Sequence, residues 1–136
     1  MRGCPIHNAM VAELAGALAR WGGQVRLEHP VWHGRVVGYA DCCADLPAGR
    51  FVIEVENEGR RIKQALKKAR LIGAERLWIV TANGRVARQV RRRLAALVST
   101  TRAFTEPRVE VLTFGQARRR LCHGNPPWTA IPEVCQ

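Results

Sequence analysis

The sequence lacks any hydrophobic run that approaches the ~20 residues of a membrane-spanning helix. It also lacks the pattern of a signal peptide, because His7, Asn8 and Glu13 interrupt the apolar stretch that such a peptide requires. We therefore expect a cytoplasmic protein. Cysteine is present five times, an odd number, and in that compartment we expect reduced thiols and no disulfide framework.

Negative charge is also in short supply. The chain has 11 Asp and Glu against 22 Lys and Arg, which gives a formal net charge of +11 and a pI near 10.9. This excess of positive charge favours a polyanionic partner, with nucleic acid first. The sequence shows no glycine-rich phosphate loop and no signature of a helix-turn-helix, a zinc finger or an RNA-binding module.

The chain is long enough for one domain with its own core. It has 136 residues, of which 47% are hydrophobic, and it contains no internal repeat and no low-complexity tract. We predict a single domain over residues 1–123. Residues 124–136 are rich in proline and show no periodicity, so we expect them to form a tail.

Apolar spacing predicts an alternation of helices and strands. Apolar residues recur at helical intervals over residues 8–21, with Asn8 as the expected N-cap. Residues 50–56 alternate, which puts Phe51, Ile53 and Val55 on one face of a strand. The remaining pattern predicts strands over 24–28, 34–43, 76–81 and 108–113, and helices over 60–72, 86–97 and 115–122.

The predicted order of elements is therefore α-β-β-β-α-β-α-β-α. A hairpin followed by β-α-β alternation is typical of a mixed central sheet flanked by helices. We accordingly predict an α/β fold.

Carboxylates gather on the predicted hairpin of this basic protein. Asp41, Asp45, Glu54, Glu56 and Glu58 lie within eighteen residues. If residues 46–49 form the hairpin loop, Asp41 lies opposite Glu54 with Cβ atoms ~5 Å apart, and Glu56 shares the face of Glu54.

Two facing carboxylates are destabilising unless a cation or a proton lies between them. Oxygen ligands at this spacing suit Mg²⁺ or Mn²⁺, which would activate water for phosphodiester hydrolysis. The alternative is a solvated hairpin face on which each carboxylate points into water.

The same residues carry a resemblance to a known family. The stretch Gly38-Tyr-Ala-Asp41, then Arg50-Phe-Val-Ile-Glu54-Val-Glu56, a helix and the strand 77–80 resembles the PD-(D/E)XK nuclease superfamily. That superfamily includes restriction enzymes, Holliday-junction resolvases and RecB-like nucleases, and its α-β-β-β-α-β core corresponds to residues 8–81. The resemblance implies a restriction endonuclease-like core in which Asp41 and Glu54 are metal ligands.

This sequence departs from the family pattern at one position, because Glu56 stands where the motif has lysine. Some restriction enzymes of the superfamily carry Glu there and are active. Glu56 is then a general base or a further ligand, but it supplies no positive charge. Lys63 in the next helix is a candidate replacement, and its alternatives are a phosphate contact or a solvated side chain.

Two further residues match family positions. Glu13, on the first helix, corresponds to an extra acidic ligand of many members, and its alternative is a surface carboxylate. Gln64 falls where RecB-like members carry Gln on the helix after the third strand.

Arginine-rich helix faces are the expected contacts to nucleic acid. Guanidinium groups suit bidentate contacts to phosphate. The candidates lie on two predicted helices: Arg60, Lys63, Lys67, Arg85, Arg88 and Arg92. The alternative for each of them is a solvated helix exterior. Trp32 and His33, between the first two strands, either stack on bases or pack against the hairpin.

The leading hypothesis is a Mg²⁺-dependent DNA endonuclease, acting for example on branched or mobile-element DNA, and we expect such an enzyme to form a homodimer. The catalytic residues would be Asp41, Glu54, Glu56, Gln64 and Lys63, and the metal ligands Asp41, Glu54 and Glu13. The alternatives are a catalytically inactive nucleic-acid-binding module and a subunit of a larger nucleic-acid-processing complex. A separate minor hypothesis is a terminal zinc site that joins Cys4 and His7 to Cys122 and His123, or to Cys135.

Overall fold

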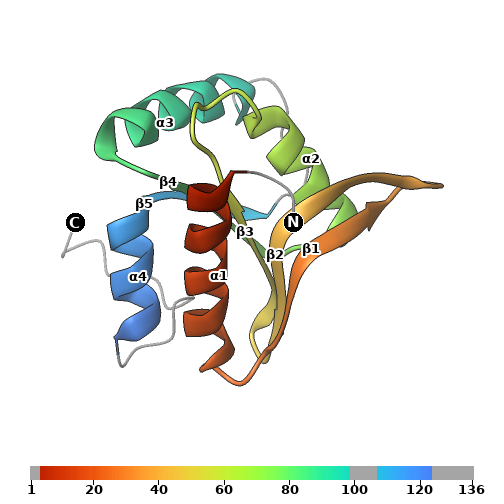
Figure 1. Ribbon diagram of the computed structural model, residues 1–136. Coiled ribbons are helices and arrows are strands. Elements are labelled where there is room, and N and C mark those ends of the chain that lie inside the picture. Colours follow the sequence, from red (N-terminus) through yellow and green to blue (C-terminus); the bar gives the residue numbers. More distant parts are fainter. Residues whose placement is uncertain (1–3, 99–106, 124–136) are drawn as a thin grey trace.

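The computed structural model describes residues 4–98 and 107–123, which fold in the predicted order of elements (Figure 1). The predicted proline-rich tail over residues 124–136 lies outside the described residues. The elements are α1 (Pro5–Ala19), β1 (Gln24–Trp32), β2 (Val36–Leu46), β3 (Gly49–Val55), α2 (Ile62–Ile72), β4 (Arg76–Thr81), α3 (Gly84–Val98), β5 (Arg108–Thr113) and α4 (Phe114–Cys122).

The five strands form one mixed sheet in the order β1-β2-β3-β4-β5. The first three strands are antiparallel, and β3, β4 and β5 are parallel to one another. The β2–β3 hairpin has the predicted register, because Asp45 pairs with Arg50 and Cys43 pairs with Val52. Gly49 closes its turn at a φ of +126°, where an added Cβ would run into the Glu75 carboxylate. The predicted α/β fold is confirmed.

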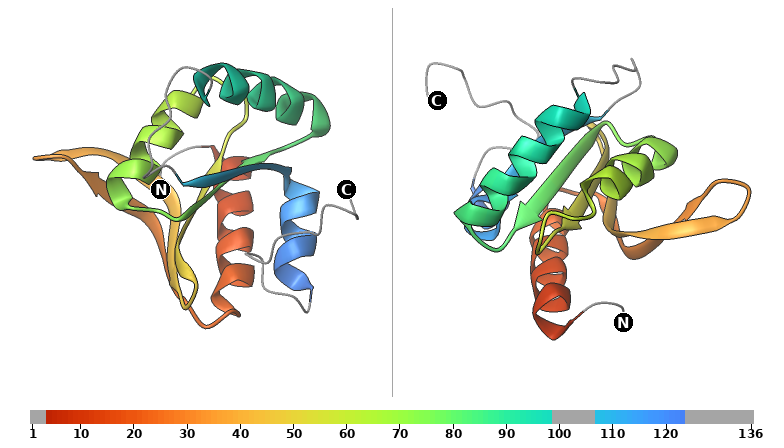
Figure 2. Two further views of the ribbon diagram at one scale, coloured as in Figure 1. Left: turned by 180° about the vertical axis from the view of Figure 1, so that it is seen from behind. Right: turned by 90° about the horizontal axis from the view of Figure 1, so that it is seen from above.

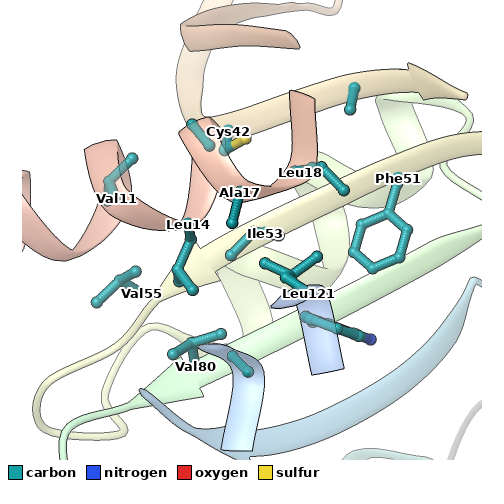
Figure 3. Packing of buried hydrophobic residues seen from close by; sticks show 14 of the residues in the cluster. Val11, Leu14, Ala17, Leu18, Cys42, Phe51, Ile53, Val55, Val80 and Leu121 are labelled. Carbon is teal, nitrogen blue, oxygen red and sulfur yellow. The ribbon is translucent and has the colours of Figure 1, made fainter. Parts of the chain in front are cut away.

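The helices cover both faces of the sheet, with α1 and α4 on one face and α2 and α3 on the other (Figure 2). Strand β3 divides its side chains as its alternation predicts: Phe51, Ile53 and Val55 face α1, whereas Val52 faces α2. On the α1 side, Phe51 meets the ring of Trp78 edge to face with centroids 4.9 Å apart. Figure 3 shows this packing from close by.

Several element boundaries differ from the prediction, and two of the differences bear on the candidate site and the hairpin beside it. Helix α1 begins at Pro5 and not after Asn8, because proline suits the first helical position and the Cys4 sulfur accepts the His7 N–H as an N-cap. Strand β1 runs to Trp32 and not to residue 28, since it stays paired with β2 up to the pair of Trp32 with Val36. This longer hairpin extends away from the helices in both views of Figure 2.

Within residues 4–98 and 107–123, no helix combines the length and the apolar character needed to cross a membrane.

Candidate active site

The site lies at the end of β3, where β2 separates from it. The last pair of the β2–β3 ladder is Cys42 with Ile53. At the residue before Cys42, the side chain of β2 replaces its backbone as the hydrogen-bond partner of β3. Asp41 Oδ2 accepts the N–H of Val55 at 2.8 Å. Asp41 therefore satisfies the end of β3 with its side chain, and the expected ladder pair of Asp41 with Glu54 does not form.

Glu54 is an acid buried in the sheet. Its side chain is only 7% exposed, and Lys68 Nζ of α2 lies 3.0 Å from its Oε1. Burial, together with the neighbouring charge of Asp41, raises the pKa of Glu54 to about 8, although Lys68 acts in the opposite direction. The two predicted metal ligands thus interact with each other, as the hairpin register suggests.

Lys68 is held from two sides. Besides its ion pair with Glu54, it donates a hydrogen bond from Nζ to the carbonyl oxygen of Tyr39 at 2.9 Å. Its stem lies along β2, since an added Cβ on Gly38 would meet Lys68 Cδ at 3.4 Å. The ammonium group is therefore fixed between α2 and β2, next to the buried carboxylate.

His7, at the start of α1, contacts Asp41. Its Nε2 lies 3.3 Å from Asp41 Oδ2, and both side chains are largely buried. This contact follows from the start of α1 at Pro5, because His7 then lies in the first turn of the helix. Asp41 therefore contacts the backbone of β3 and the imidazole of α1 with the same oxygen.

The Glu56 carboxylate binds backbone N–H groups, unlike the Glu54 carboxylate, which pairs with Lys68. The N–H of Glu56 donates to Val80 O at 2.8 Å, and its Oε1 accepts the N–H groups of Glu58 (3.2 Å) and Gly59 (3.0 Å). The carboxylate therefore shapes the turn after β3, in which Gly59 has a φ of +73°.

A cleft of about 900 Å³ opens over these groups. Its acidic lining includes Asp41, Glu54 and Glu56, and its cationic lining comes from the start of α2 and its exposed side. The predicted residues that line it are Asp41, Glu54, Glu56, Gln64, Arg60 and Lys67, and the unpredicted ones include His7, Arg61 and Lys68. Carboxylates and cations are thus brought together in one depression.

Glu13 and Lys63, two of the predicted site residues, are not brought to this cleft. The Glu13 carboxylate, on the middle of α1, pairs with Arg118 of α4 at 3.1 Å and is about half exposed. Lys63 is exposed on α2 but does not line the cleft. The lysine that reaches the carboxylates is Lys68, four residues after Gln64, whose Nζ lies 3.0 Å from Glu54 Oε1.

The predicted arginines of α3 are exposed but lie outside the cleft: Arg85, Arg88 and Arg92. Helix α3 packs on the same face of the sheet as α2 (Figure 1). Two other arginines of α3 bind backbone, because Arg93 donates to Gly59 O and Arg91 donates to Val111 O.

Asp45, at the other end of β2, is neutralised within the fold. Its two oxygens accept from Arg50 Nε at 2.7 Å and from Arg26 at 2.8 Å. These two guanidinium groups, Arg50 foremost, lower the pKa of Asp45. Only part of the acidic cluster in the sequence therefore belongs to the candidate site.

The minor hypothesis of a zinc site between Cys4 and Cys122 is wrong. Trp21 Nε1 donates to the Leu121 carbonyl at 3.0 Å, so the end of α4 lies beside the end of α1. Cys4 precedes the other end of α1, about a helix length, or roughly 20 Å, away. Cys135 lies outside the described residues.

Of the cleft residues that the sequence analysis did not place there, Lys68 could have been found from its spacing and His7 could not. Lys68 follows the predicted site residue Gln64 by four positions, so it shares the same helix face. His7 gives no signal as long as the helix is expected to begin after it.

Among the residues that the structure describes, no group of three or more His, Cys, Asp and Glu side chains is arranged to hold a metal ion by itself.

Comparisons with family models, with curated proteins and with solved structures found no match to this chain.

Proposed function

We propose that the protein is a metal-dependent nuclease that hydrolyses phosphodiester bonds in DNA. The observation that carries this proposal is the buried Glu54 carboxyl group beside Asp41, in a cleft whose other side is lined by cations. Burial of an acid next to a second acid costs free energy, and a perturbed pKa in a cleft is characteristic of functional sites.

The donor set fits Mg²⁺ or Mn²⁺. Asp41 and Glu54 would hold the ion, because a divalent cation would relieve the repulsion that contributes to the raised pKa of Glu54. Two carboxylates are enough for Mg²⁺, which usually keeps several waters and binds substrate phosphate oxygens. When bound, the ion would supply an activated water and neutralise charge that develops on the scissile phosphate.

Lys68 would provide the positive charge that the motif lacks at Glu56. Its ammonium group favours the ionised form of Glu54 and lies on the lining of the cleft. Glu56 would instead hold the turn after β3, since its Oε1 already accepts two backbone N–H groups. His7 would act as a positioning residue that orients the Asp41 carboxylate.

The cationic lining would bind the phosphate backbone on either side of the cut. Arg60, Arg61 and Lys67 reach the cleft, and Gln64 lies among them. The exposed arginines of α3 would extend the contact along the same side of the molecule. Each phosphate contact should steepen the salt dependence of duplex binding by roughly 0.9 log units per decade of salt. This division into an acidic centre and basic flanks agrees with the resemblance to the PD-(D/E)XK superfamily.

The test is cleavage of labelled linear, circular and branched DNA, and of RNA of the same sequence, with Mg²⁺, with Mn²⁺ and with a chelator. We expect metal-dependent cleavage that Glu54→Gln and Asp41→Asn each reduce by at least about 100-fold, as loss of a group that stabilises transition-state charge does. Asp45→Asn is the matched control, because it makes the same chemical change on the same strand outside the cleft.

The alternative of an inactive binding module predicts a different result. The protein would retain DNA without cleaving it under any metal condition, and the Glu54→Gln and Asp41→Asn variants would behave like the unaltered protein. Loss of cleavage in Asp45→Asn to the same extent as in Asp41→Asn would contradict the assignment of the site.

A further inference from the structure

The β1–β2 hairpin continues beyond the rest of the sheet. Strand β1 stays paired with β2 out to Trp32 and Val36, whereas β2 pairs with β3 only up to Cys42. Residues 28–41 therefore form a two-stranded arm, which projects from the body in Figures 1 and 2. Ala40 and Val31 are buried in the same cluster as the core of α2, so the arm is anchored from its base up to Val31, the residue before Trp32.

The arm exposes apolar side chains near its tip. Trp32 is 65% exposed and Val37 is 42% exposed. Among the described residues there are four exposed large hydrophobic side chains, and three of them lie on β1 and β2. An exposed indole on a projecting ribbon contributes little to the core, and its flat face is open to a partner.

The arm is continuous with the proposed active site. Val37, Gly38 and Tyr39 of β2 line the cleft, as does Glu28 at the base of the arm. Val36, the pairing partner of Trp32, directly precedes Val37. A nucleic-acid strand that passes over the carboxylates can therefore follow the arm to its tip.

The charge of the arm suits a nucleic acid. Residues 29–40 contain no carboxylate, and His33 and Arg35 lie in the turn that follows Trp32. The turn is closed by the His33 N–H, which donates to Arg35 O at 2.8 Å, with Gly34 at a φ of +73°. Across the cleft lie the cations of α2, including Lys67 and Arg61. An anionic backbone would thus meet cations on either side of the acidic centre of the cleft.

From these observations we infer that Trp32 stacks on an unpaired base of the DNA strand whose phosphate occupies the cleft. In a paired duplex both faces of each base are covered by its neighbours, so only an unpaired or splayed base offers a free face to the indole. The preferred substrate class is therefore DNA with a single-stranded segment or a junction beside the cut site. This inference rests on the proposed function.

The test measures binding separately from cleavage. In the Glu54→Gln background, the full chain is titrated with a duplex and with the same duplex carrying a short unpaired segment that contains 2-aminopurine. We compare the protein that keeps Trp32 with Trp32→Phe and Trp32→Ala. Ile6→Ala is the control for loss of an exposed apolar side chain that neither lies on the arm nor lines the cleft. Thermal melts check that each variant is folded.

When Trp32 stacks on the 2-aminopurine base, binding should quench the fluorescence of that base. The expected result is that Trp32→Ala weakens binding to the unpaired substrate by roughly tenfold and abolishes this quenching. Trp32→Phe should keep most of the affinity for the unpaired substrate and most of the quenching. Neither variant should change binding to the plain duplex by much. Equal affinity of Trp32 and Trp32→Ala for the unpaired substrate overturns the inference. It is also overturned if sedimentation shows that Trp32→Ala only converts a dimer into a monomer, since the arm would then bind a second copy.

The two proposals fail in different ways. Metal-dependent cleavage without any effect of Trp32→Ala leaves the nuclease standing and removes the stacking role. Trp32-dependent binding to unpaired DNA without cleavage by the unaltered protein leaves the stacking role standing and removes the nuclease.

Discussion

The burial of Glu54 predicts an unusual dependence of stability on pH. Its pKa is about 8 in the folded protein, against an ordinary value of 4.5. Since the folded-state pKa lies above the unfolded one, the stabilising contribution is complete below pH 4.5 and is lost as the pH rises through about 8. This acid therefore makes the fold less stable at neutral pH than at mildly acidic pH.

The magnitude follows from linkage. With these two pKa values, the free energy of unfolding falls by roughly 2–3 kcal/mol between about pH 5.5 and about pH 7.5 because of this one group. Glutamine cannot ionise, so Glu54→Gln should lack this fall. Urea denaturation followed by circular dichroism at the two pH values, for both proteins, gives the difference directly. Other titrating groups, such as His29, are common to both proteins and cancel in that difference.

The matched control is Glu13→Gln, which makes the same chemical change at the half-exposed carboxylate that pairs with Arg118. It should follow the pH dependence of the unaltered protein. Parallel stability curves for the unaltered protein and Glu54→Gln would refute the reasoning, because they would mean that Glu54 does not bind a proton on folding. Adding Mg²⁺ at the higher pH should stabilise the unaltered protein and not Glu54→Gln, since an ion that binds only the native state raises the free energy of unfolding.

Three other variants test separate parts of the structure. Lys68→Met should raise the pKa of the buried acid further, so that DNA cleavage near neutral pH falls by roughly tenfold and partly recovers at higher pH. Asp45→Asn should cost about 0.5–1 kcal/mol of unfolding free energy at neutral pH, because the pair with Arg26 and Arg50 is partly exposed. The lowered pKa of Asp45 stabilises the fold above its ordinary value of 3.8, so the variant should also lose less stability than the unaltered protein as the pH falls below it. Phe51→Ala should lower the free energy of unfolding by about 3–5 kcal/mol in urea titration, since the ring is fully buried against Trp78.

Much of the fold could be predicted from the sequence because its signals are local. The alternation of Phe51, Ile53 and Val55 marks a strand with two different faces, and the residues between Asp45 and Arg50 mark a tight hairpin. Together they fix the register of β2 against β3. That register in turn predicts that Asp41 and Glu54 come together, and in the structure the charge of Asp41 contributes to the raised pKa of Glu54.

The rest depends on contacts between distant segments, which no local pattern encodes. Glu13 has the same residue type as the expected ligand, but α4 lies beside α1 and supplies Arg118 as its partner. Lys63 is a reasonable substitute for the missing lysine by its position in the sequence, but only the face of α2 that carries Lys68 is turned to β2. The pairing of His7 with Asp41 requires the exact start of α1, and sequence patterns define helix ends poorly.

The two aspartates of β2 differ in how the fold balances their charge. Asp45 and Asp41 lie four residues apart on one strand, and the fold gives Asp45 two guanidinium partners. Asp41 instead contacts the N–H of Val55 and the imidazole of His7, and its charge raises the pKa of Glu54. In a protein with a net charge of +11, a second arginine pair would be the simple way to neutralise this acid. A single ammonium group, that of Lys68, is shared between Glu54 and a carbonyl oxygen. Asp41 and Glu54 thus lack the guanidinium partners that Asp45 has, and the divalent ion of the proposed function would supply positive charge at this point.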